Sequence, residues 1–126
     1  MTTISELQKR CGEAAAAKGF HEDRPLDGRI EPNRLRDWQG NKLMLIVSEV
    51  AEAQDELRKG NSAYHTYYPG NREDLPWKPE GVPSELADVV IRVLDFCYTE
   101  GIDLEAIIEE KLAYNATREY KHGKKF

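Results

Sequence analysis

The chain has 126 residues, a net charge of −5 at pH 7 and 33% charged residues. That length supports a single domain with one modest core, and we expect residues 1–126 to form it. The acidic balance excludes a protein that binds nucleic acid polymers through general positive charge. Two cysteines, Cys11 and Cys97, are too few for a disulfide framework or a thiolate metal site.

No stretch of the sequence is typical of a membrane segment or of a secretory signal. The longest uninterrupted apolar run covers residues 43–47, far short of the roughly 20 residues that span a bilayer. With no membrane partner and no disulfide framework, the expected compartment is the reducing cytoplasm.

The first predicted helix covers about residues 3–18. Thr2 or Thr3 is suited to cap its N-terminus, and Gly19 is suited to end it. Its apolar residues recur at a helical period, and a run of alanines supports helix formation. Residues 19–33 contain glycine and proline and predict a connection, in which Asn33 is a candidate cap for the next helix.

A long second helix is predicted from about Leu35 or Asn41 to Lys59. One stripe of apolar residues on it is expected to face the interior: Leu43, Ile46, Val47, Val50, Ala53 and Leu57. Three glutamates share another face because they are three and four residues apart: Glu49, Glu52 and Glu56. Glu56 and its neighbour Asp55 are also compatible with ordinary surface charge.

Residues 61–81 predict a long loop, because they contain three prolines and two glycines and show no helical or strand period. A third helix follows from Pro83–Ser84 to about Gly101. Asp103 is expected to cap a fourth helix, from Leu104 to about Tyr120. Four helices without a repeat predict an all-α fold with a four-helix bundle-like core.

The third helix is apolar on almost every side except one acidic strip, which begins with Glu85 and Asp88. A helix of this composition belongs in an interior, and carboxylates buried there need a compensating cation. If this strip faced Glu49 and Glu52 of the second helix, the four side chains would form a cage of oxygen ligands. Such a cage suits Mg²⁺, or Mn²⁺ in its place.

Positive residues gather near the C-terminal end of the chain. Lys111, Asn115 and Arg118 are spaced to share one face of the predicted fourth helix, and Lys124 follows in the tail. A cation, an amide and a guanidinium in a row are able to grip a polyphosphate and a sugar or base edge. An acidic cage beside a basic face is the arrangement expected for a metal-bound phosphate substrate.

Each of these patterns also has a simpler interpretation. Glutamates three residues apart are common on solvated helix faces, and so is the spacing of the basic residues. The acidic strips are also compatible with internal pairing, for instance of Glu85 or Asp88 with Arg92, in a non-enzymatic helical protein-interaction module. A di-iron carboxylate bundle is disfavoured, because no histidine follows any of the four candidate carboxylates by three residues.

Taken together, the motifs resemble those of the MazG-like all-α nucleoside triphosphate pyrophosphatases, a superfamily that includes the dimeric dUTP and dCTP pyrophosphatases. The family signature is Glu-x-x-Glu on one helix and Glu-x-x-Asp on the next. Here these are Ser48-Glu-Val-Ala-Glu52 and Glu85-Leu-Ala-Asp88-Val-Val-Ile-Arg92, followed by the basic residues of the fourth helix and tail. The resemblance covers about residues 35–125, and the 61–81 insertion departs from the family pattern.

The resemblance implies a four-helix core that works as a homodimer or a dimer of dimers. It implies Mg²⁺-dependent cleavage of a nucleoside triphosphate between the α and β phosphates, which yields the monophosphate and pyrophosphate. The implied metal ligands are Glu49, Glu52, Glu85 and Asp88. A glutamate of the first pair, Glu49 before Glu52, would also orient or deprotonate the attacking water.

The substrate contacts implied by the resemblance are less closely matched. Lys111 and Asn115 fall where the family places substrate-contacting residues, Arg118 is a looser match, and Lys124 extends the same positive potential. Three aromatic residues are candidates for holding the base: Trp38, Tyr64 and Trp77.

Overall fold

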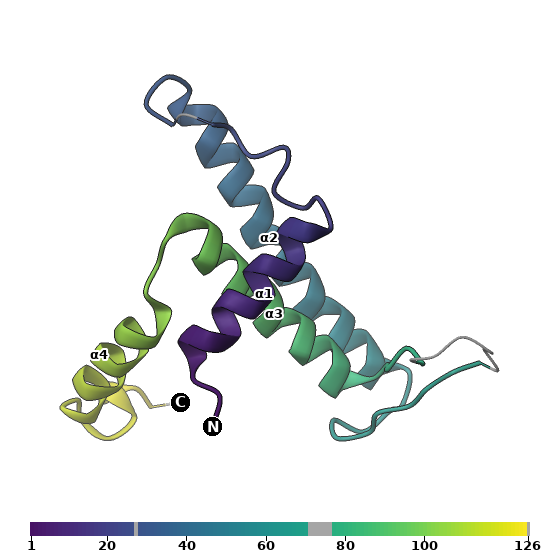
Figure 1. Ribbon diagram of the computed structural model, residues 1–126. Helices are drawn as coiled ribbons and strands as arrows, with labels where there is room; N and C mark the ends of the chain where they lie inside the picture. The colour runs from purple at the N-terminus through teal and green to yellow at the C-terminus, as the bar shows by residue number, and fades with distance from the viewer. Residues whose placement is uncertain (27, 71–76, 126) are drawn as a thin grey trace.

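The computed structural model describes residues 1–26, 28–70 and 77–125. Over these ranges the regular structure is helical, apart from one isolated antiparallel bridge between Tyr67 and Glu80. The α-helices run in the order α1 (Ile4–Ala17), α2 (Pro32–Arg58), α3 (Val82–Glu100) and α4 (Leu104–Ala116), and a short 3₁₀ helix η1 (Tyr120–Gly123) follows (Figure 1). The predicted all-α class is confirmed.

Three of the helices form the packed body of the molecule. α2 lies alongside α3, and α1 packs across the same α3 (Figure 1). α4 diverges from this body and meets α1, where the Glu105 carboxylate accepts hydrogen bonds from the Ile4 N–H at 3.0 Å and the Ser5 hydroxyl at 3.1 Å. The described residues therefore form an open arrangement of helices, in which α4 is not enclosed by the others.

The predicted caps of α1 and α4 are confirmed. Thr3 and Glu6 exchange side-chain-to-backbone hydrogen bonds of 3.0 Å in each direction, which satisfies two free N–H groups of the first turn. Asp103 accepts from the Ala106 N–H at 3.1 Å and so begins α4.

Two predicted helix boundaries are wrong. α2 begins at Pro32, ahead of the predicted start, because a proline at the first turn lacks only an N–H that would have no partner there. Asn33 therefore lies inside the helix and does not cap it. α4 ends at Ala116, before the predicted end, and the Thr117 hydroxyl donates back to a carbonyl of the last turn at 2.7 Å. Arg118 consequently lies beyond the helix.

A glycine allows α1 to lie close to α3. Gly12 is buried, and a Cβ at its position would lie 2.0 Å from the side chain of Tyr98. Any larger residue would push the two helices apart, because protein interiors leave no room for an overlap of that size. The close approach of α1 to α3 therefore depends on this position.

The connection between α1 and α2 is fastened to the C-terminal end of α3. Arg24 donates to the two carboxylate oxygens of Glu100 at 2.8 and 3.0 Å, and Gln39 of α2 donates to the same carboxylate. The hydrogen bonds from Arg24 hold the pKa of Glu100 below its usual value. A two-pronged ion pair of this kind defines orientation as well as distance, so it holds the connection against α3, and the hydrogen bond from Gln39 joins α2 to the same carboxylate.

The buried face of α2 is not the predicted apolar stripe. The buried residues of α2 are Glu49, Ala53 and Glu56, so the face that carries glutamates is the enclosed one. The side chains of the predicted stripe remain between 48% and 53% exposed at Leu43, Val47, Val50 and Leu57. The prediction that this stripe is interior is confirmed at Ala53 and wrong for the single chain at the four exposed residues, because no described element covers them.

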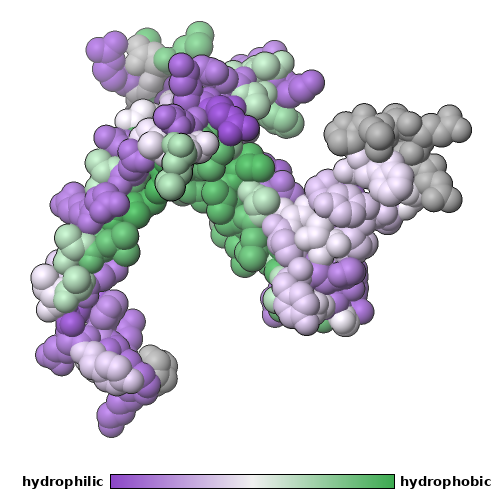
Figure 2. All heavy atoms as spheres, turned by 60° about the horizontal axis from the view of Figure 1, so that its bottom comes forward, coloured by the Kyte–Doolittle hydropathy of each residue, from purple (hydrophilic) through white to green (hydrophobic). Residues whose placement is uncertain are grey.

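The uncovered hydrophobic surface extends over three helices, and we call it the apolar face. It comprises Leu43, Val47, Val50 and Leu57 of α2, Leu86 and Val90 of α3, and Ile107 and Leu112 of α4, all of which are exposed. Figure 2 shows hydrophobic residues gathered along the concave side of the molecule. No helix in the described ranges is long and apolar enough to cross a bilayer.

Candidate metal centre

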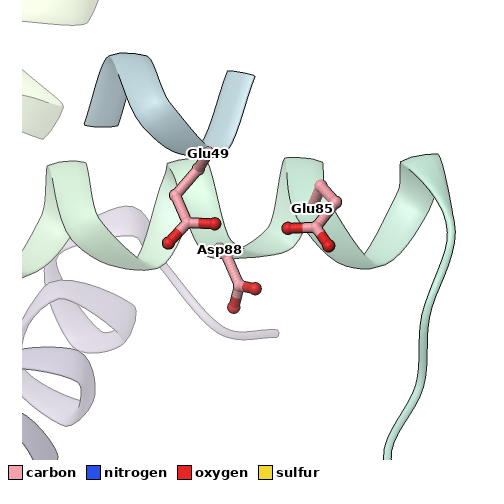
Figure 3. A group of neighbouring side chains, drawn as sticks. All are labelled: Glu49, Glu85 and Asp88. Carbon is pink, nitrogen blue, oxygen red and sulfur yellow. The ribbon is translucent and has the colours of Figure 1, made fainter. Parts of the chain in front are cut away.

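Three carboxylates from α2 and α3 converge at one place (Figure 3). Glu49 of α2, with Glu85 and Asp88 of α3, each offer one oxygen, and these oxygens lie within 4.8 Å of one another. Glu85 and Asp88 point to the same side because residues three apart share a helix face, and α2 packs along that side. The two acidic motifs of the sequence are therefore adjacent in space.

Glu52, the fourth predicted ligand, lies at the edge of this group. Its side chain is exposed, and it is not among the three residues whose oxygens fall within 4.8 Å of one another. It still acts on the cluster, since its hydrogen bond and its charge both raise the pKa of Glu85. Glu52 thus borders the three carboxylates on their solvent side.

Two carboxylates of the cluster have raised pKa values, so their surroundings disfavour the ionised forms. Burial raises the pKa of Glu85 to about 7, and the adjacent Glu52 contributes to that increase. Burial also raises the pKa of Asp88, and the charge of Glu49 adds to the effect. Within the described residues, the buried Oε2 atom of Glu85 has no hydrogen-bond partner. A carboxylate in this condition would be stabilised by a cation.

Among the described residues, Arg92 makes an ion pair with the cluster. Arg92 Nε donates to Glu49 Oε1 at 2.7 Å. Burial opposes ionisation of Glu49, but the hydrogen bond and charge of Arg92 outweigh it and lower the pKa of this residue. The sequence alternative paired Arg92 with Glu85 or Asp88, whereas the structure pairs it with Glu49. The two carboxylates of α3 remain the less compensated ones.

The oxygen set fits a hard divalent cation. Carboxylate oxygens are ligands that Mg²⁺ and Mn²⁺ prefer in proteins. The oxygens lie within 4.8 Å of one another, and since two ligands of one Mg²⁺ are at most about 4.2 Å apart, a small movement of the side chains would bring all three onto one ion. Three carboxylates leave part of an octahedral shell for water or for phosphate oxygens of a substrate, which is how Mg²⁺ is usually held in phosphate-processing sites.

A cavity of about 710 Å³ opens beside the cluster, between α1, α2 and α3. Glu49 and Asp88 belong to its wall, and much of the remaining wall is apolar. Cationic side chains also line it: Arg10, Lys18, Lys42 and Arg92. A concave, largely apolar space of this size with a few charged groups is typical of a site for a small molecule.

Of the three aromatic candidates, Trp38 lines this cavity. Its indole N–H donates to Asp23 Oδ1 at 3.0 Å, and Lys42 Nζ lies 5.1 Å from the centre of its ring. The indole N–H therefore has a hydrogen-bond partner, and a cation lies near the ring. Tyr64 and Trp77 are exposed and are not part of the cavity wall.

The basic residues predicted to contact substrate lie away from the cavity in the single chain. Lys111 and Arg118 each lie 5.9 Å from the centre of the Tyr114 ring on α4. Asn115 is on the same helix, and Lys124 is exposed in the tail. None of the four predicted residues lines the cavity, because α4 diverges from α2 and α3.

Sequence reasoning missed the cations that α1 brings to the cavity. Arg10 and Lys18 line it together with Leu7 and Ala14 of the same helix. A signal was present, because positions 7, 10, 14 and 18 recur at the helical period and so share one face. Because that face mixes cations with small apolar residues, it does not form an apolar stripe and so does not stand out as a packing face.

Glu56 is not the surface charge that its position suggested. It is buried, and it accepts hydrogen bonds from the Tyr67 hydroxyl at 2.9 and 3.0 Å and from Asn61 Nδ2 at 2.7 Å. Lys59 Nζ lies 3.7 Å from its carboxylate. The hydrogen bond from Tyr67 is the main reason that the pKa of Glu56 is held below its usual value. This carboxylate anchors the segment that follows α2.

Comparison of the chain with protein-family models, with curated proteins and with solved structures gave no match.

Proposed function

We propose that the protein is a Mg²⁺-dependent nucleoside triphosphate pyrophosphohydrolase of the MazG-like type. It would convert a ribo- or deoxyribonucleoside triphosphate to the monophosphate and pyrophosphate. The observation that carries the proposal is the convergence of Glu49, Glu85 and Asp88 beside a cavity with cationic walls. These carboxylates come from the same two motifs that the resemblance assigns to the metal.

We assign separate roles to the side chains of this site. Glu49, Glu85 and Asp88 hold the divalent cation, which when bound supplies positive charge to the triphosphate. Arg10 and Lys18 on the cavity wall would neutralise phosphate charge that the metal leaves uncompensated, whereas Lys42 lies beside Phe20 and Trp38. Release of the proton from Glu85 accompanies metal binding, because a ligand carboxylate must be ionised.

Glu52 is the best-placed group to accept a proton from the attacking water. The resemblance favours Glu49 for this role, but Glu49 is engaged by Arg92 and belongs to the three-carboxylate group, whereas Glu52 borders that group on its exposed side. The water oxygen forms a bond to the α phosphorus while the bond from that phosphorus to the bridging oxygen breaks. Pyrophosphate then leaves with the electron pair of the broken bond.

Pyrophosphate release from a panel of nucleoside triphosphates with Mg²⁺ tests the proposal. We expect release by the natural protein and a loss of about 10³-fold in Asp88→Asn, which removes one charge from the ligand set without changing its size. Glu109→Gln, which neutralises an exposed glutamate on α4, is the matched control and keeps full activity. Absence of release with every nucleotide, or full activity in Asp88→Asn, would contradict the proposal.

A homodimer is the smallest assembly that we propose for the working form, and the exposed area supports it. The chain exposes 9932 Å², whereas a compact monomer of 14.4 kDa exposes about 6,800 Å². The excess, about 3,100 Å² for one chain, is about 6,200 Å² for two copies, which is more than enough for the roughly 2,000–5,000 Å² that obligate dimers bury over both partners. The apolar face supplies the kind of surface that such an interface buries, and a second copy of the chain presents the same surface.

Light scattering during size exclusion tests the assembly. We expect a mass of twice 14.4 kDa or a higher multiple. Val90→Asp would place a charge in the apolar face and reduce the mass toward that of the monomer, since an unpaired buried charge costs several kcal/mol. Thr2→Asp, outside the helices, is the control. A natural protein that is monomeric throughout would contradict the proposed assembly.

The non-enzymatic interaction module remains the second candidate, because of the ion pair between Arg92 and Glu49 and because of the apolar face. In that case the acidic strips need no metal. Thermal melting separates the two candidates: a cation that binds the folded state raises the melting midpoint, and a module with internally paired charges shows no such shift at millimolar Mg²⁺.

A further inference from the structure

A second polar group lies in the same cavity, further along α3 from the carboxylate cluster. Asp95 and Thr99 belong to the cavity wall. His21 Nε2 donates to Asp95 Oδ1 at 2.7 Å and lies 3.1 Å from Thr99 Oγ1, which itself donates to the Asp95 carbonyl at 2.9 Å. These contacts hold the Asp95 carboxylate in one orientation.

The second carboxylate oxygen of Asp95 is left without a partner. Its Oδ1 atom accepts the hydrogen bond from His21, whereas the described residues provide no donor for Oδ2. The Asp95 side chain is 21% exposed, so it lacks the full hydration of a surface carboxylate. An acceptor in a largely apolar wall favours a ligand that brings an N–H or O–H donor to it. The proposed hydrolysis has no use for this group.

The distance from the cluster indicates which part of a nucleotide meets Asp95. Asp95 follows Asp88 by seven residues, which is about 10 Å along the helix axis. Phosphate, sugar and base occur in that order along a nucleotide. With the phosphates at the carboxylate cluster, a group two turns away is therefore beyond the sugar and beside the base. Phe20 and Phe96 also line the cavity, and their rings suit a planar base.

We propose that Asp95 recognises the exocyclic amino group of the base, so that the cavity selects nucleotides of cytosine and adenine over those of uracil and hypoxanthine. A carboxylate accepts a hydrogen bond from an amino group, but it repels the carbonyl oxygen that keto bases carry at the same position. This inference rests on the proposed function for the orientation of the nucleotide. Asp95 acts in it as a specificity-determining residue.

Calorimetric titration of deoxycytidine and deoxyuridine monophosphates, with Mg²⁺ present, tests the inference without requiring turnover. The natural protein should bind the cytidine nucleotide about 10- to 100-fold more tightly. Asp95→Asn should abolish or reverse this preference, because the amide oxygen stays with His21 and the amide NH2 then faces the base, where it donates to a keto oxygen. Asp37→Asn, an exposed position of α2 outside the cavity, should keep the original ratio.

Asn at position 95 retains an acceptor for His21, and a melting curve checks that the variant is folded. A comparison that needs no variant is deoxyadenosine against deoxyinosine monophosphate on the natural protein, which should favour the amino base. Equal affinity for amino and keto bases, an unchanged ratio in Asp95→Asn, or no binding of any of the four monophosphates would overturn the inference.

The two proposals fail in different ways. Pyrophosphate release with no preference for amino bases in binding defeats the inference and leaves the proposed function standing. A preference in binding with no release from any triphosphate defeats the proposed function, while the assignment of Asp95 as a base-reading residue stands.

Discussion

Glu49 and Glu56 are both buried on the same face of α2, yet their surroundings differ. Glu56 has neutral and positive partners on several sides, namely the Tyr67 hydroxyl, the Asn61 amide and a lysine ammonium. Glu49 has a single guanidinium, that of Arg92, and faces two further carboxylates. Both have a lowered pKa, although only one belongs to a group that lacks compensating charge.

Burial of a carboxylate therefore does not by itself identify a metal site. The Glu56 region is complete without a ligand, because its hydrogen bonds are made within the chain. The Glu49 region leaves the Oε2 atom of Glu85 unpartnered among the described residues and raises the pKa of Glu85 to about 7. The candidate site thus differs from the Glu56 region in having a buried carboxylate that lacks hydrogen-bond partners and compensating charge.

The largest expected difference between the two regions is in catalysis. Glu52→Gln should lower kcat for pyrophosphate release by about 10²- to 10⁴-fold with little change in KM, because it removes the proposed proton acceptor and leaves the three-carboxylate group intact. Glu56→Gln should leave kcat within about threefold below its melting temperature, since its contacts stabilise the fold. Similar losses of kcat in both variants would abolish the functional distinction between the regions.

The next expected difference is in the melting midpoint. Replacing a glutamate by glutamine should lower it in the Glu56 region and raise it in the Glu85 region. Glu56→Gln weakens hydrogen bonds to a buried acceptor and should lower the melting midpoint by about 5 °C. Glu85→Gln removes a repelled carboxylate and, without metal at pH 8, should stabilise the fold on the order of 1–3 kcal/mol. Thermal melting in a metal-chelating buffer measures both, and destabilisation by Glu85→Gln would contradict the charge assignment.

A further expected difference is the pH dependence of the metal-free protein. The pKa of Glu85 is raised from 4.5 to about 7, so its favourable contribution is complete below pH 4.5 and is lost as pH rises through 7. The pKa of Glu56 is lowered, so its contribution is present above pH 4.5 and is lost as pH falls through its pKa. Between pH 5 and 8, only the Glu85 region should change stability.

Mg²⁺ should reverse the trend in the Glu85 region. Since the cation binds the ionised carboxylate, its effect on the melting midpoint should be larger at pH 8 than at pH 5.5, and it should be absent in Glu85→Gln. Glu56→Gln should retain the full Mg²⁺ effect and is the matched control. An equal Mg²⁺ effect in the natural protein at both pH values would show that Glu85 does not take part in binding.

The sequence alone determined the features that depend on neighbours along the chain. The capping box at Thr3, the cap at Asp103 and the pairing of Glu85 with Asp88 on one helix face all follow from local geometry, and the structure has each of them. The all-α class follows for the same reason, because the helical period and the turn residues act over a few positions.

Which helix faces pack against each other is seen only in the tertiary structure. The apolar stripe of α2 predicted one packing, and the chain adopts another in which Glu49 and Glu56 are enclosed and Val47 is half exposed. The partner of Arg92 and the cations that α1 brings to the cavity through Arg10 were also undetermined by the sequence. When two faces of a helix are able to pack, its own sequence does not determine which face is buried. The buried face depends on the combined free energy of all contacts across the molecule and its assembly.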